Sequence, residues 1–160
     1  MLTTIRLNGL EKRIQELYSV ENIQKPSDIT LTVFDDWLKV QTVNRIGATN
    51  TVELRDTYHV FLDRTKGLAE RRIEMAHELG HMLLHSGNQI WIDGDMRLKQ
   101  EWQANRFAMY ALVPSHMLIC SIGDKICDAA CVADLAFEYG VTHRFMENRL
   151  KLLKEDFALV

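Results

Sequence analysis

The stretch EMAHELGHMLLH, residues 74–85, contains two histidines four positions apart, His77 and His81, with Glu78 directly after the first. Apolar residues recur at helical spacing through and before this stretch, which predicts an α-helix over residues 68–85. Four residues along a helix correspond to a net rotation of about 40° and a rise of about 6 Å. The two histidines therefore leave one face of the helix and can bind a single metal ion together.

Glu78 lies about 100° around the helix from His77, outside the histidine pair but near enough to reach water held on a metal there. Zinc suits two histidines in this arrangement and lowers the pKa of its bound water to about 7. A neighbouring carboxylate can take the proton as that water attacks a carbonyl carbon, and can then protonate the leaving amine. Glu78 is therefore predicted to be the catalytic base. The alternative is a helix whose histidines are only solvated or hydrogen-bonded.

A third ligand has to come from elsewhere, because a catalytic zinc usually has three protein ligands and one open position. The metzincin pattern would require glycine at position 84 and histidine at position 87, where this chain has Leu84 and Gly87. That class of metalloprotease is excluded. His85 continues the four-residue spacing from His81 but lies one turn beyond the pair, so we expect it to have a surface or capping role.

The segment EWQANRFAMYALVP, residues 101–114, offers the better candidate. It is predicted to be helical, and it places Glu101 and Asn105 one turn apart on the same face. Two histidines and a glutamate form a known hydrolytic zinc set, so the predicted ligands are His77, His81 and Glu101 around one zinc ion per chain. Asn105 is predicted to hydrogen-bond the free ring nitrogen of one of the two histidines.

The remaining segments predict an α+β domain. Residues 9–21 and 96–112 have helical periodicity, as do residues 125–139 and 143–155. Residues 27–38 predict a short helix, although the β-branched run from Ile29 to Val33 argues partly for a strand. Residues 40–62 are rich in valine, threonine and aromatic residues, which predicts two or three short strands in a small antiparallel sheet. We expect one domain over residues 1–160, with a helical part at 1–39, a metal-binding core at 40–115 and C-terminal helices at 116–160.

The composition is that of an ordinary globular protein, with 47% hydrophobic and 26% charged residues and a net charge of −3. This charge gives no electrostatic reason to expect nucleic acid or an anionic membrane as a partner, and no apolar run is long enough to cross a membrane. Three cysteines leave one unpaired in any disulfide scheme, and no signal segment is visible at the N-terminus. The predicted location is the reducing cytoplasm, with buried thiols.

The combination of RRIEMAHELGHMLLH with EWQANRFAMYALVP resembles the ImmA/IrrE family of metallopeptidases. The tail VADLAFEYGVTHRFMENRLKLL and the β-rich stretch before the histidines are also similar to that family, so the resemblance covers roughly residues 40–155. It implies a zincin-like fold in which a small sheet packs on the metal-binding helix. It also implies that His77, His81 and Glu101 are ligands and that Glu78 is the base.

The resemblance further implies the biological role of a zinc-dependent endopeptidase. Many members of the family are encoded on prophages or mobile elements, where they cleave a helix-turn-helix repressor and release gene expression. Others act in stress-response regulation. The expected partner is therefore a protein substrate, and cleavage of a phage-type repressor would derepress its genes.

The sequence leaves two other functions open. The tail has the spacing of a helix-turn-helix, and residues 142–154 carry four basic side chains against one acidic side chain, Glu147. A DNA-binding regulator that uses the histidines as a structural metal site is therefore the first alternative. A protein-binding module without catalysis is the second. The negative net charge of the whole chain argues against DNA binding.

Overall fold

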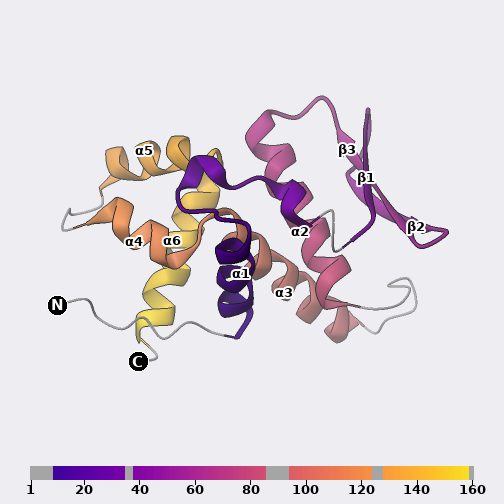
Figure 1. Ribbon diagram of the computed structural model, residues 1–160. Helices are drawn as coiled ribbons and strands as arrows, with labels where there is room; N and C mark the ends of the chain where they lie inside the picture. The colour runs from indigo at the N-terminus through magenta and orange to yellow at the C-terminus, as the bar shows by residue number, and fades with distance from the viewer. Residues whose placement is uncertain (1–8, 35–37, 86–93, 124–127, 159–160) are drawn as a thin grey trace. The chain divides into compact units, whose positions relative to one another are not determined.

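The computed structural model describes residues 9–34, 38–85, 94–123 and 128–158. The chain forms two compact units, one made of Thr30–Ala108 and one made of Met1–Ile29 with Met109–Val160. We call the first the sheet unit and the second the helical unit. Figure 1 labels their elements. The predicted α+β class is confirmed, since the described residues form six α-helices and one three-stranded sheet.

The sheet unit contains three strands and two α-helices. In chain order its elements are η2 (Leu31–Phe34), β1 (Val40–Arg45), β2 (Asn50–Leu54), β3 (Thr57–Asp63), α2 (Leu68–Leu84) and α3 (Gly94–Leu112), of which α3 continues into the helical unit. The short helix predicted over residues 27–38 is instead two 3₁₀ turns, η1 (Pro26–Asp28) and η2, and residues 35–37 lie outside the described part. β-Branched residues between the two turns disfavour a continuous helix.

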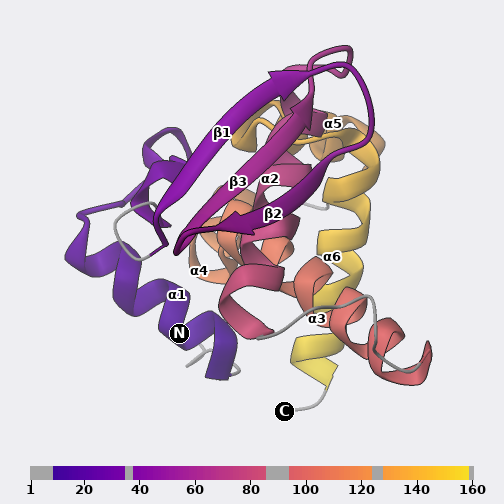
Figure 2. The same cartoon turned by 90° about the vertical axis from the view of Figure 1, so that its right-hand side faces the viewer.

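The sheet is mixed, so the prediction of an antiparallel sheet is corrected. Its order is β1-β3-β2, with β1 parallel to β3 and β2 antiparallel to β3, as Figure 2 shows with α2 behind the strands. The central place goes to β3 because it carries the buried residues Val60 and Leu62, whereas both neighbouring strands are mostly exposed. Arg55 and Asp56, both with positive φ, form the tight turn from β2 to β3.

The strand register decides which side chains face α2. Thr42 of β1 and Thr51 of β2 both pair with Val60 of β3, so all three side chains lie on the same face of the sheet. Val60 is fully buried. That face is covered by α2, whose contacts with β3 bring the sheet against the helix that carries His77 and His81.

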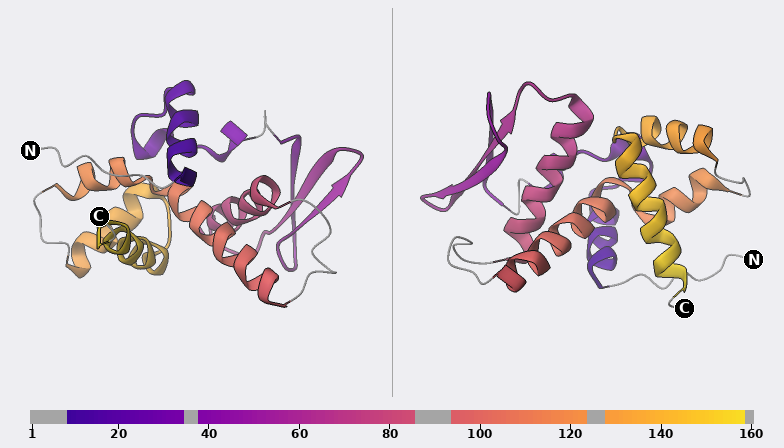
Figure 3. Two further views of the ribbon diagram at one scale, coloured as in Figure 1. Left: turned by 90° about the horizontal axis from the view of Figure 1, so that it is seen from below. Right: turned by 180° about the vertical axis from the view of Figure 1, so that it is seen from behind.

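Helices α2 and α3 approach each other at a glycine. A Cβ atom on Gly80 would lie 3.0 Å from Cα of Ala104 and 3.1 Å from Cβ of Phe107, so the two helix backbones touch at this point. Figure 3 shows the two helices crossing. The contact lies next to His81 on α2 and next to Asn105 on α3, which places the predicted ligand-bearing segments opposite each other.

The helical unit contains α1 (Gly9–Val20), η1, α4 (Ser115–Ile122), α5 (Ala129–Tyr139) and α6 (His143–Ala158). Asp128 caps the start of α5 by accepting a hydrogen bond from the backbone of Cys131. Gly140 ends α5 in the left-handed conformation, which turns the chain into α6. The core is formed by residues from every α-helix of the unit, including Ile14, Leu17, Tyr18, Leu118, Leu135 and Met146.

Arg149 of α6 is completely buried in this core. Its guanidinium donates hydrogen bonds to the carbonyl oxygen of Val113 at 2.8 Å and to the hydroxyl of Ser115 at 2.6 Å, and it lies 3.6 Å from the carboxylate of Glu11. Burial lowers the pKa of Arg149, and the charge of Glu11 opposes that shift. The basic surplus counted in favour of DNA binding therefore includes one residue that is not on the surface.

Two features of the described residues concern membrane-spanning helices and the cysteines. No described helix has the length and apolar character needed to cross a membrane. Cys120 is exposed and Cys131 is disulfide-bonded, so the expectation of buried thiols is wrong for these two residues. The third cysteine, at position 127, lies outside the described residues.

Candidate metal centre

His77 and His81 project from one face of α2 toward a common point. Their Nε2 atoms lie 3.0 Å apart, and their rings meet edge to face with centroids separated by 4.7 Å. Both are largely shielded from solvent, with 21% and 12% of their side-chain surface exposed. The helical spacing that the sequence predicted thus brings the two nitrogens within reach of one ion.

Glu101 of α3 faces this pair. Its Oε2 lies 3.2 Å from Nε2 of His77, and its Oε1 lies 3.3 Å from Nε2 of His81. The ligand atoms offered by His77, His81 and Glu101 all lie within 4.8 Å of one another. Since Glu101 comes from a different helix, the group is assembled by the approach of α3 to α2.

The three side chains fit zinc by both their chemistry and their spacing. Tetrahedral zinc with bonds of about 2.0–2.2 Å has its ligand atoms about 3.3–3.6 Å apart, which is slightly more than the separations of 3.0–3.3 Å found among His77, His81 and Glu101. Two imidazole nitrogens and one carboxylate oxygen are also a donor set that zinc accepts. Three protein ligands leave a fourth position of a tetrahedron for water or substrate.

Asn105 lies one turn after Glu101 on α3 and contacts His77, one of the candidate ligands. Its Oδ1 is 3.1 Å from Nδ1 of His77. Because an amide oxygen can only accept, Nδ1 of His77 carries the proton in this contact and Nε2 keeps its lone pair. This is the tautomer in which the Nε2 atom that faces His81 and Glu101 can bind a metal.

The environment of His81 favours the form of its ring that binds metals. Burial lowers the pKa of His81, the charge of His77 lowers it further, and the carboxylate of Glu101 acts in the opposite direction. A lowered pKa means that the imidazole is neutral over a wider range of pH. Metal ligation requires this neutral ring.

His85 is close to the group without joining it. Its ring centroid is 5.5 Å from that of His81, and its Nε2 lies 3.2 Å from the carbonyl oxygen of Gln100. It is also the residue at which α2 ends, with its backbone N–H bonded to the carbonyl of His81. Among the described residues, the group that can hold a metal consists of His77, His81 and Glu101.

Glu78 is half-buried between α2 and the sheet. Its Oε2 accepts a hydrogen bond of 2.5 Å from the hydroxyl of Thr51, which lies on β2. Thr51 is not among the residues predicted for the site from the sequence. A threonine at an inward-facing strand position is common, and only the packing of β2 against α2 shows that its hydroxyl reaches a carboxylate.

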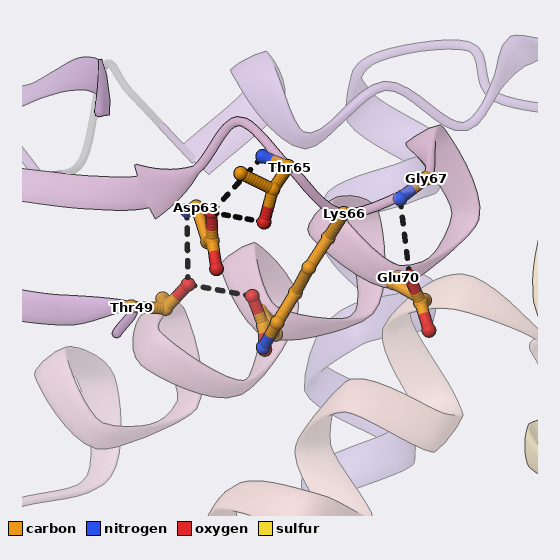
Figure 4. A network of polar contacts seen from close by, with 7 residues as sticks. Thr49, Asp63, Thr65, Lys66, Gly67 and Glu70 are labelled. Atoms are coloured by element: carbon orange, nitrogen blue, oxygen red, sulfur yellow. Dashed lines mark hydrogen bonds and ion pairs between the residues drawn. The ribbon is translucent and has the colours of Figure 1, made fainter. Parts of the chain in front are cut away.

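A second threonine and glutamate lie one turn earlier on α2. Thr49, just before β2, donates a hydrogen bond of 2.5 Å to Oε2 of Glu74, and Lys66 forms an ion pair with Oε1 of the same carboxylate. Figure 4 shows Thr49 also accepting from the backbone N–H of Asp63, at 3.4 Å. We call Thr49, Asp63, Lys66 and Glu74 the Glu74 anchor.

Local hydrogen bonds stabilise the turn that connects β3 to α2. The carboxylate of Asp63 accepts hydrogen bonds from the backbone and the hydroxyl of Thr65, at 3.0 Å and 2.7 Å, and these bonds lower the pKa of Asp63. At the start of α2 the N–H of Gly67 donates to the carboxylate of Glu70, as Figure 4 shows. The turn thus brings Lys66 back toward Glu74.

Comparisons with known proteins found a family match and similar proteins. Residues 35–151 match the family described as Peptidase_M78, IrrE N-terminal-like domain. The phage-like element PBSX protein XkdA of Bacillus subtilis (strain 168) is 27% identical over 156 residues, which cover 95% of this chain and 76% of the relative. The uncharacterized protein YqaB of the same organism is 23% identical over 143 residues, which cover 89% of this chain and 83% of the relative.

Proposed function

The chain belongs to the IrrE N-terminal-like family, Peptidase_M78, and from this membership and the geometry of the site we propose that it is a zinc-dependent endopeptidase. One zinc ion would be held by His77, His81 and Glu101. The observation that carries the proposal is the convergence of these three side chains, from two helices, with all ligand atoms within 4.8 Å of one another. Family membership supports peptide-bond hydrolysis as the reaction class, and the two imidazoles and one carboxylate support zinc as the metal.

Each side chain of the site has a distinct task. When bound, the metal acidifies water and polarises the carbonyl group of the scissile peptide bond. Glu78 acts as the general base, which takes a proton from the attacking water on one carboxylate oxygen and delivers it to the leaving amine. Asn105 holds Nδ1 of His77 and thereby keeps the Nε2 lone pair directed at the metal position.

The substrate that we propose is a helix-turn-helix repressor of the phage type, whose cleavage would derepress its genes in the cytoplasm. This part of the proposal is supported by the similarity to XkdA, which is named as a protein of a phage-like element. A peptidase requires a protein substrate, whereas a DNA-binding regulator requires an exposed basic surface. The burial of Arg149 removes one of the basic residues on which that alternative relied.

The decisive experiment replaces the base and leaves the ligands intact. The Glu78→Gln variant should retain about one zinc per chain and the wild-type fold, while cleavage of a purified helix-turn-helix repressor of the phage type should fall by roughly 10²–10⁴-fold. Zinc content and cleavage rate are measured on the same preparation. The matched control is Glu74→Gln, one turn earlier on α2, which should lower stability and leave cleavage within a few-fold of the wild type.

The outcomes separate the parts of the proposal. Cleavage by Glu78→Gln at the wild-type rate would show that Glu78 is not the base. Purified wild-type protein that binds no divalent metal would overturn the metal centre. A shift of duplex DNA that weakens with added salt, without proteolysis, would favour the DNA-binding alternative.

A further inference from the structure

We propose that Thr51 is a positioning residue for the general base, a role that rests on the proposed function of Glu78. The hydroxyl of Thr51 donates to Oε2 of Glu78 at 2.5 Å, across the contact between β2 and α2. Thr51 is half-buried and its side chain lies on the sheet face that is covered by α2. The bond holds one oxygen of the carboxylate and leaves the other for the reacting water.

The hydrogen bond between Thr51 and Glu78 occurs where the spacing of residues along the strand matches the spacing along the helix. Thr49 and Thr51 are two residues apart, which is about 6.6–6.8 Å along an extended chain. Glu74 and Glu78 are four residues apart, which is about 6 Å along a helix. Both threonines donate to Oε2 of their glutamate at 2.5 Å. The segment from Thr49 to Thr51 therefore runs alongside α2 in register, and the bond to Glu78 is one of a pair.

The pairing of β2 with β3 keeps Thr51 in this register. β2 forms an antiparallel ladder with β3, in which Thr51 is opposite the fully buried Val60. The Glu74 anchor lies outside this ladder, where it ties the residue before β2 to α2 and to the end of β3 (Figure 4). The position of the hydroxyl is thus fixed by the backbone of the sheet and does not depend on a flexible loop.

The hydrogen bond restrains a side chain that would otherwise rotate. A hydroxyl has a single proton, and the hydroxyl of Thr51 donates it to Oε2 of Glu78. In the described part of the chain, Oε1 of Glu78 has no hydrogen-bond partner. Without Thr51, the carboxylate could turn away from the reacting water, and a misplacement of about 1 Å in a reacting group can lower the rate by about 100-fold.

The test compares two substitutions at Thr51 with a matched control. Thr51→Val keeps the shape and the strand preference of the side chain but removes the hydroxyl. It should lower kcat for repressor cleavage by about 10–100-fold, with KM and zinc content unchanged. Thr51→Ser restores the hydroxyl and should return kcat to within a few-fold of the wild type. Thr49→Val removes the equivalent bond to Glu74, and it should lower the urea midpoint while kcat changes less than about threefold.

A second measurement tests the pair without any cleavage assay. The urea midpoints of Thr51→Val, Glu78→Ala and the double variant are compared with that of the wild type. We expect the shift of the double variant to be smaller than the sum of the single shifts, because both single changes break the same bond. Additive shifts would overturn the contact, and a wild-type kcat in Thr51→Val would overturn the positioning role.

The two measurements also distinguish a failure of this inference from a failure of the proposed function. If the zinc-loaded wild type cleaves no repressor, the proposed function fails. A shift of the urea midpoint in the double variant that is smaller than the sum of the single shifts would then still support the bond between Thr51 and Glu78. Additive shifts would overturn it.

Discussion

Nε2 of His77 lies 3.0 Å from Nε2 of His81. One carboxylate oxygen of Glu101 lies 3.2 Å from Nε2 of His77, and the other lies 3.3 Å from Nε2 of His81. The first separation is set within one helix, by the four-residue spacing. The second depends on the approach of α3 to α2, which occurs where Gly80 lies against Ala104. The candidate metal centre therefore depends on local periodicity and on a helix contact.

Removal of a proposed ligand should abolish tight zinc binding, and removal of the neighbouring histidine should not. Glu101→Gln and His81→Ala each leave two of the three protein ligands, so we expect a large loss of zinc after dialysis against a chelator. His85→Ala is the control, because His85 lies beside His81 on α2 but outside the group. Loss of zinc in His85→Ala that equals the loss in His81→Ala would contradict the assigned set.

Gly80→Ala should separate α2 from α3. The added methyl group would meet the backbone of Ala104 at 3.0–3.1 Å, which a helix backbone cannot relieve without moving. We expect a loss of about 1–3 kcal/mol of unfolding free energy, together with weaker zinc binding. Urea denaturation and zinc titration measure the two effects. Gly94→Ala, at the start of α3, places its new methyl group more than 4 Å from every described residue other than its neighbours in the chain, and should leave both unchanged.

Arg149→Met should be strongly destabilising. It removes a fully buried guanidinium that contacts the carboxylate of Glu11, the carbonyl oxygen of Val113 and the hydroxyl of Ser115. The expected loss is about 3–5 kcal/mol of unfolding free energy, measured by urea denaturation. Lys151→Met, on the exposed side of the same helix, should change stability by less than about 0.5 kcal/mol. Equal effects of the two substitutions would show that Arg149 is not held as described.

Stability should decrease as the pH falls below 6.5, in part because of His116. Burial lowers the pKa of His116 below its usual value of 6.5, with a smaller opposing effect of Glu11, and its Nδ1 has no hydrogen-bond partner among the described residues. The folded state then stays neutral at His116 while the unfolded state takes up a proton. The contribution is therefore complete above pH 6.5 and is lost progressively below it.

The measurement for His116 is the unfolding free energy of the metal-free protein between pH 7.5 and about 5. His116→Gln should flatten the dependence on pH in this range, since glutamine does not titrate. An unchanged slope in His116→Gln would mean that other groups account for the whole effect.

Local sequence patterns were sufficient to predict most of the helices and the α+β class of this protein. The sequence by itself determined that residues 68–84 form a helix with His77 and His81 on one face, because helical periodicity relates residues only a few positions apart. The same reasoning identified the helix that carries Glu101 and Asn105, and the α+β class followed from segments of different periodicity. The motif combination also led to the family that the comparison later matched.

Only the tertiary structure decided which of these elements meet. The parallel pairing of β1 with β3, the hydrogen bond between Thr51 and Glu78 and the burial of Arg149 all join residues that are far apart in the chain. Periodicity shows which face of an element is apolar, but it does not specify the partner of that face or its register. A threonine on a strand and an arginine on a helix look like surface residues until the packing of the other elements places a carboxylate beside them.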